Sequence, residues 1–150
     1  EELCSRYRHH YLQRQHEVML FEGTLPMLAG LKERNHQLAV ATGKSRRGLD
    51  DVLKVSHLRS VFDATRTADE TTSKPHPQML LELMSELGVE PERTLMIGDT
   101  THDLQMALNA GAASVGVSYG AHDHDAFAEF LPRSVAHSVA ELDAWLVGHA

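Results

Sequence analysis

The sequence predicts an α/β fold in which helices flank a parallel sheet on both faces. Short apolar runs alternate with segments of helical periodicity along most of the 150 residues. The runs are continuous, as in "QLAVAT" and "TLMIG", and continuous runs are typical of strands that are buried on both faces. A chain of this length is the size of one ordinary domain and can bury a core of its own.

The expected elements follow one another in a regular order. Helices are expected over residues 1–18, 24–35, 45–53, 77–87, 101–109 and 138–146. Strands are expected over residues 37–42, 61–65, 94–98 and 113–118. Ser45 is placed to cap the third helix, and Ser138 with Glu141 has the spacing of a capping box. Gly88 and Gly111 are expected to end their helices, because glycine readily adopts the left-handed conformation that a helix end uses.

The composition is that of a globular protein with an acidic balance. The net charge of -7 argues against general nucleic-acid binding, because phosphate contacts need clustered Lys and Arg. The basic cluster of Lys44, Arg46 and Arg47 is too small to change this. No apolar stretch approaches the roughly 18 residues of a membrane span, and the single cysteine, Cys4, suits a reducing compartment. We therefore expect a cytoplasmic protein that binds neither nucleic acid nor membrane, and the sequence leaves its oligomeric state undetermined.

Polar residues that could carry chemistry follow the predicted strands. Thr42 and Gly43 follow the first strand, Lys74 lies in the loop after the second, and Asp99 follows the third with Asp103 one helical turn later. Folds of this kind bind ligands at the carboxyl ends of their strands. A hydroxyl and backbone N–H groups at a helix start hold phosphoryl oxygens, a lysine neutralises charge, and paired carboxylates suit Mg²⁺. Together they indicate a site for phosphate and a metal ion.

Each of these residues also has a plainer explanation. The Thr42 and Gly43 pair is consistent with a simple strand end and helix start, and Lys74 with one more solvated lysine. Asp99 could only favour the start of the next helix through its dipole, and Asp103 could be a surface carboxylate. The placement of all of them at successive strand ends is what favours a common site.

Three segments resemble, in order, the second, third and fourth motifs of the haloacid-dehalogenase-like (HAD) phosphatase superfamily, in particular its phosphoglycolate-phosphatase-like branch. They are "LAVATGKS", "SKPHPQML" and "LMIGDTTHDLQMALNAG". The resemblance covers the chain from about residue 21 to the end. It implies a Rossmann-like HAD core over residues 21–150, which is incomplete, and it assigns residues 1–20 to the last helix of a mobile helical cap.

The family pattern, carried over position by position, implies a Mg²⁺-dependent phosphatase site. Thr42 and the Gly43 amide would bind the transferring phosphoryl group. Lys74 would be catalytic by balancing the charge between that group and the nucleophile. Asp99 would contact Mg²⁺, and Asp103 would hold a metal-bound water or the lysine. The expected partner is a small phosphorylated metabolite, with phosphoglycolate as one candidate.

The first motif of the family is missing from this sequence. It is an apolar strand that ends in Asp-x-Asp-x-Thr or Asp-x-Asp-x-Val, whose first Asp forms an aspartyl-phosphate and whose second acts as general acid and base. The only Asp-x-Asp pair, Asp123 with Asp125, comes after the fourth motif, and Glu22 in "LFEGTL" stands alone. We therefore expect that the first, central strand is absent from this chain, and that residues 1–150 alone are inactive and poorly stable.

Three other interpretations of the sequence compete with the phosphatase. A P-loop nucleotide site around "TGKS" would need its first glycine at Leu38, which excludes it. A non-catalytic module that binds phosphate compounds or a partner fits the same α/β plan and stays open as the alternative. His122 and His124 in "AHDHD" could bind zinc, but a loop that leads into a helix explains them equally well.

Overall fold

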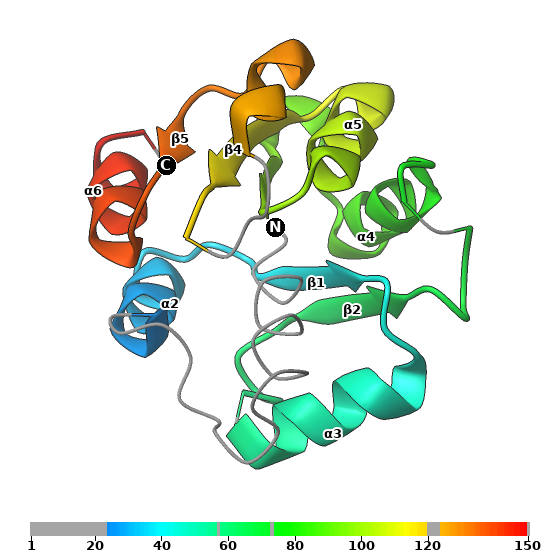
Figure 1. Cartoon of the computed structure of the whole chain (residues 1–150). Coiled ribbons are helices and arrows are strands. Elements are labelled where there is room, and N and C mark those ends of the chain that lie inside the picture. Colours follow the sequence, from blue (N-terminus) through cyan, green and yellow to red (C-terminus); the bar gives the residue numbers. More distant parts are fainter. Residues whose placement is uncertain (1–23, 57, 73, 120–123, 150) are drawn as a thin grey trace.

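The computed structural model describes residues 24–56, 58–72, 74–119 and 124–149 (Figure 1). The helix predicted over residues 1–18 and the cap assigned to residues 1–20 lie outside the described residues, as do His122 and the side chain of His124. Among the described helices, none combines the length and the apolar character that a membrane crossing requires.

Helices and strands alternate along the chain in the predicted order. The α-helices are α2 (Thr24–Glu33), α3 (Arg46–Ser56), α4 (Gln78–Leu87), α5 (Thr101–Ala110) and α6 (Val139–His149). Two short 3-10 helices, η1 (Pro91–Arg93) and η2 (His124–Phe130), lie in the connections. The strands are β1 (Ala39–Thr42), β2 (Ala64–Thr67), β3 (Leu95–Gly98), β4 (Ala113–Val117) and β5 (Val135–Ala136).

All paired strands are parallel, and they form two sheets. β1 pairs with β2 in one sheet, and β4 lies between β3 and β5 in the other. Helix α3 connects β1 to β2 and helix α5 connects β3 to β4, because parallel neighbours require a crossover connection. Within the described ranges, no strand pairs with the second edge of β1 or of β3.

Two apolar clusters show that both sheets lie between the same two layers of helices. Successive residues of β1, Val40 and Ala41, belong to different clusters, and so do Met96 and Ile97 of β3. The first cluster includes residues of α2, α3 and α6, and the second includes residues of α4 and α5. Figure 1 shows α2 and α6 on one side of the strands and α4 and α5 on the other. The predicted architecture, parallel strands flanked by helices, is therefore confirmed.

The predicted position of the second strand, residues 61–65, is wrong, since β2 spans Ala64–Thr67. Phe62 packs into the first apolar cluster from the turn that precedes the strand. The next residue, Asp63, donates its N–H to Leu38 O at 2.7 Å and accepts the Leu38 N–H on its carboxylate at 2.8 Å. The apolar residues before the strand thus fill the core from a turn. A short apolar run in the sequence does not distinguish such a turn from a buried strand.

The predicted helix ends are confirmed where a cap determines them. Ser45 Oγ accepts the N–H three residues further on at 3.1 Å, and Ser138 Oγ accepts the Glu141 N–H at 3.1 Å. Gly88 and Gly111 end α4 and α5 in the left-handed conformation, with φ of 69° and 78°. By contrast, β5 is not predicted from the sequence, because a strand of two residues carries no periodic signal.

Candidate active site

Thr42 lies at the carboxyl end of β1 and is fully buried. It stands in register with Thr67, the last residue of β2. The Lys44 N–H donates to Thr42 Oγ1 at 3.1 Å, which closes a tight turn around Gly43. The segment from residue 42 to residue 46, called here the β1–α3 loop, therefore joins a strand end to a helix start, an arrangement suited to binding phosphate.

Lys74 and Asp103 form a buried ion pair that joins two distant parts of the chain. Lys74 Nζ lies 2.5 Å from Asp103 Oδ1, and the two side chains are only 8% and 0% exposed. Asp103 Oδ2 accepts the N–H of Asp99 at 3.1 Å and the N–H of Thr100 at 3.2 Å. A single carboxylate thus fixes the loop before α4, the end of β3 and the start of α5.

Local sequence explains why Asp103 faces this way. Thr100 Oγ1 caps α5 by accepting the Asp103 N–H, and the Asp103 carboxylate accepts the Thr100 N–H. These two bonds form a complete capping box. The glycine before Asp99 makes room for it, because a Cβ on Gly98 would lie 2.2 Å from Asp103 Cβ. Asp103 is therefore no surface carboxylate, and Gly98 is required by its close approach.

The loop that carries Lys74 is held at further points. Asn109 in α5 donates to Pro75 O at 3.0 Å, and the Thr72 N–H donates to Gln78 Oε1 at 3.0 Å. The first bond ties the loop to α5, the helix that presents Asp103, and the second ties it to the start of α4. Because the loop is hydrogen-bonded on both sides of Lys74, the ammonium group of Lys74 is held in a defined position.

Asp99 follows β3 directly and is 4% exposed. Its carboxylate and that of Asp103 offer hard oxygen donors, which Mg²⁺ prefers, and neither sulfur nor imidazole belongs to this pair. In the described ranges no group of three or more His, Cys, Asp or Glu residues could hold a metal ion by itself. The carboxylates of Asp99 and Asp103 could therefore supply part of a coordination shell for Mg²⁺, with the remaining ligands from elsewhere. His102, between the two carboxylates in sequence, is exposed.

The sequence-predicted residues fall into two groups in the structure. Lys74, Asp99 and Asp103 are brought together directly by the ion pair and by the hydrogen bond from the Asp99 backbone. Thr42 and Gly43 lie on the other sheet, at the end of β1. Each group occupies the carboxyl end of its strand, which is the ligand-binding end of parallel α/β sheets.

Sequence reasoning missed three charged residues that surround the β1–α3 loop. Arg46, at the start of α3, binds Glu70 through its guanidinium and Asp69 through its backbone N–H. The hydrogen bond from Arg46 is the main reason that the pKa of Glu70 is lowered, and the bond to Glu70 in turn raises the pKa of Arg46. The signal of Asp69 and Glu70 in the sequence is only a charged stretch, "TADE", after the second strand, and that of Arg46 is its place in the basic cluster with Lys44 and Arg47.

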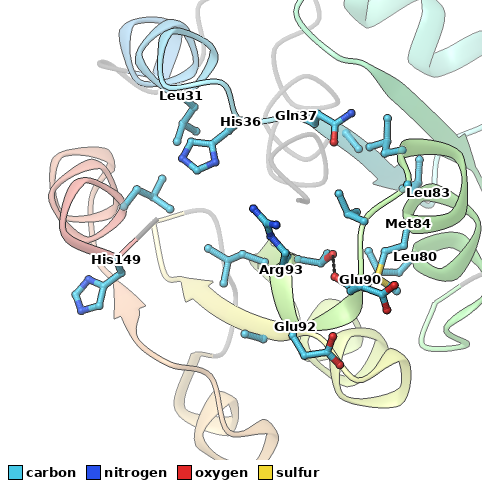
Figure 2. A pocket seen from close by; sticks show the side chains of 18 of the residues that line it. Leu31, His36, Gln37, Leu80, Leu83, Met84, Glu90, Glu92, Arg93 and His149 are labelled. Carbon is cyan, nitrogen blue, oxygen red and sulfur yellow. Dashed lines mark hydrogen bonds between the residues drawn. The ribbon is translucent and has the colours of Figure 1, made fainter.

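A cavity of about 570 Å³ lies away from these residues, near the amino ends of the strands (Figure 2). It is bordered by Ala39 at the start of β1, Leu95 at the start of β3 and Ala113 at the start of β4, together with residues of α2, α4 and α6. Figure 2 shows the Arg93 side chain directed into this space. The cavity thus borders strands of both sheets, at the end opposite Thr42 and Asp99.

Comparisons with known proteins agree with these features. A family model described as haloacid dehalogenase-like hydrolase matches residues 1–117. The probable phosphatase IndB of Dickeya dadantii is 40% identical over 125 residues, which are 83% of this chain and 54% of that protein. The pyrophosphatase PpaX of Halalkalibacterium halodurans is 32% identical over 144 residues, which are 95% of this chain and 67% of that protein.

A solved structure extends the comparison to the fold. The HAD family hydrolase from Deinococcus radiodurans, crystallised with bound phosphate and sodium, matches with a TM-score of 0.77 and 27% sequence identity over 85% of this chain and 59% of that one. This chain spans 54% and 67% of the length of the two curated relatives. On its motifs, its parallel architecture and these similarities, the chain belongs to the haloacid dehalogenase-like hydrolase family.

Proposed function

We propose that this chain is part of a Mg²⁺-dependent phosphatase that hydrolyses a small phosphomonoester through an aspartyl-phosphate. The observation that carries the proposal is the buried Lys74–Asp103 ion pair beside Asp99 at the end of β3. Burying a charged pair is costly, and hydrophobic residues of similar volume would often be at least as stable. A fixed cation next to a buried carboxylate therefore suits a phosphoryl group better than it suits an apolar core.

Each residue of the site has a distinct task in this proposal. Lys74, held by Asp103, neutralises charge on the phosphoryl group and on the nucleophile. Thr42 and the Gly43 amide bind phosphoryl oxygens at the end of β1. Asp99 would hold Mg²⁺, and Asp103, whose oxygens already bind Lys74 and two backbone N–H groups, would act on the metal through a bound water. When bound, the ion supplies charge neutralisation at the oxygens of the reacting phosphate.

The nucleophile and the general acid have no counterpart among these residues and must come from another segment. The second edges of β1 and β3 are unpaired within the described ranges, and both apolar clusters extend from one strand to the other. We propose that a further parallel strand, ending in Asp-x-Asp, inserts between β1 and β3. Its carboxylates would then emerge between Thr42 and Asp99.

The similar proteins support the class of substrate without specifying it. The Dickeya protein is called a probable phosphatase, the Halalkalibacterium protein a pyrophosphatase, and the Deinococcus structure contains phosphate. What these names share is phosphate chemistry. We propose a small phosphorylated metabolite, with phosphoglycolate as one candidate, and a reducing, cytoplasmic setting for a chain with one cysteine.

The test compares the 150-residue chain alone with the same chain co-expressed with the part of the Dickeya relative that it does not match. Turnover of p-nitrophenyl phosphate with MgCl₂ is expected only for the combination, and Lys74→Met is expected to abolish it. Lys54→Met, a change of an exposed lysine on α3, is the control and should leave turnover unchanged. Full turnover by the chain alone would contradict the proposed division of the site.

A non-catalytic module that binds phosphate or a partner is the second candidate. It is favoured by the missing Asp-x-Asp motif in the first part of the sequence. This candidate predicts that the chain binds inorganic phosphate and that no added segment produces turnover. The two proposals are therefore separated by the same co-expression experiment.

A further inference from the structure

The β1–α3 loop is held from outside by an acidic pair that the proposed chemistry does not use. Asp69 and Glu70 follow β2, and both contact Arg46, the first residue of α3. We propose that Asp69 and Glu70 are positioning residues that keep the β1–α3 loop in the conformation that binds a phosphoryl group. This inference rests on the proposed function, since it assigns the loop that carries Thr42 to phosphate.

Asp69 fixes the backbone of the loop where α3 begins. The Arg46 N–H donates to Asp69 Oδ1 at 3.0 Å and to Oδ2 at 3.2 Å. Thr67 Oγ1 donates to the same carboxylate at 2.5 Å, and the Ala68 N–H donates to Lys44 O at 3.1 Å. A carboxylate bonded to the first N–H groups of a helix is favoured by its charge and by the helix dipole. The loop is thus bonded at two backbone positions to the segment that follows β2.

Glu70 fixes the side chain of Arg46, the residue whose backbone N–H is bound by Asp69. Arg46 Nη2 donates to Glu70 Oε1 at 2.7 Å, and Nη1 donates to Thr65 Oγ1 at 2.8 Å. Asp50, one turn along α3, accepts from Arg46 Nη1 at 3.2 Å. The Thr67 N–H donates to Glu70 Oε1 at 3.1 Å, which fixes the carboxylate in turn. Because the guanidinium is planar and bonded on several sides, α3 cannot rotate without breaking these bonds.

The charge of the acidic pair and its positioning role predict opposite effects on phosphate binding. Asp50, Asp69 and Glu70 surround the single cation of Arg46, so their net charge should repel an anion bound nearby. On electrostatic grounds alone, removing a carboxylate would strengthen phosphate binding. A positioning role predicts that removing it weakens binding, and the sign of the change therefore separates the two.

The experiment uses the 150-residue chain with inorganic phosphate and MgCl₂ as the probe. Asp69→Ala is expected to speed hydrogen exchange at the Arg46 amide by about tenfold and to weaken phosphate binding, measured by calorimetry, by about threefold or more. Asp69→Asn keeps an acceptor oxygen and is expected to recover most of both effects. Glu141→Ala is the matched control, because Glu141 is an exposed carboxylate of α6 that accepts a backbone N–H, that of His137, at 2.9 Å, and it should change neither quantity.

Three results would overturn the positioning role. The first is phosphate binding that strengthens in Asp69→Ala, and the second is hydrogen exchange at the Arg46 amide that stays unchanged in that variant. The third is a lack of protection at the Arg46 and Ala68 amides in the unsubstituted chain. If those amides are protected but the unsubstituted chain binds no phosphate, the assignment of the β1–α3 loop to phosphate fails for this chain, while faster exchange in Asp69→Ala still supports the hold of the acidic pair on the loop.

Discussion

Replacing Gly98 with alanine is expected to displace the carboxylate at the centre of the site. A Cβ at this position would lie 2.2 Å from Asp103 Cβ, 2.6 Å from its Oδ2 and 2.7 Å from its Cγ. Gly98 and Asp103 are both buried, and a strand and a capped helix hold their backbones. Because Asp103 Cβ moves only with its backbone, the new methyl group must shift the start of α5 relative to β3, and the Asp103 carboxylate moves with it.

The free energy of unfolding of Gly98→Ala is expected to fall by about 3 to 5 kcal/mol. Forcing an extra methyl group into a close-packed site costs about 1 to 3 kcal/mol. Moving Asp103 also breaks its bonds from the Asp99 and Thr100 N–H groups and its buried pair with Lys74, and breaking a buried pair typically costs about 3 to 5 kcal/mol. The two contributions overlap because they act on one side chain.

Urea unfolding followed by circular dichroism measures this loss as a lower midpoint with an unchanged slope. Gly148→Ala is the matched control, since Gly148 lies in α6 and a Cβ there meets nothing within 4 Å. Alanine at that helical position is expected to raise stability by about 0.5 to 1 kcal/mol. A loss of less than about 1 kcal/mol in Gly98→Ala would refute the close approach of Asp103 as the reason for this glycine.

Three further predictions concern the ion pair, the helix cap and the acidic pair. Lys74→Met removes the cation from the buried Asp103 carboxylate, so the free energy of unfolding in urea is expected to fall by about 3 kcal/mol; a loss typical of an exposed pair would contradict this. Thr100→Ala removes the side-chain cap of α5 and is expected to cost about 1 kcal/mol in the same assay, and an unchanged midpoint would argue against the capping box. The hydrogen bond from Arg46 lowers the pKa of Glu70 below its ordinary 4.5, so the pair stabilises the fold above that pH and the gain is lost as the pH falls through the lowered value. Thermal melts from about pH 6 to about pH 3 should therefore show a smaller loss of stability for Glu70→Gln than for the unsubstituted chain, by less than about 1 kcal/mol for an exposed pair; equal losses would rule out this linkage.

Many elements of this fold could be predicted because they obey rules that act within a few residues. Gly88 and Gly111 end their helices through a backbone conformation that glycine adopts easily. Ser45 and Ser138 start theirs through a side-chain oxygen within reach of an N–H three residues away. The burial of β1 on both faces follows from its unbroken apolar run.

The sequence indicates which residues stand at the candidate site, but few of the contacts that these residues make. Thr42, Lys74 and Asp99 follow apolar runs, and parallel strands collect such residues at one end. The predicted boundaries failed where Phe62 packs from a turn, because burial alone does not distinguish a turn from a strand. Asp69 escaped notice because it lies in a charged segment with no periodicity, and only its bond to the α3 backbone gives it a role.

By itself, the sequence determined the α/β class, the order of the elements, the helix ends and the residues that stand at the strand ends. Only the tertiary structure decided that Asp103 is fully buried and paired with Lys74, 29 residues away in sequence. It also decided that Gly98 must be a glycine, and that the strands form two sheets, one that ends at β1 and one that ends at β3. The physical reason is distance along the chain, since periodicity and caps act between near neighbours, whereas these contacts exist only once helices α4 and α5 have packed against their strands.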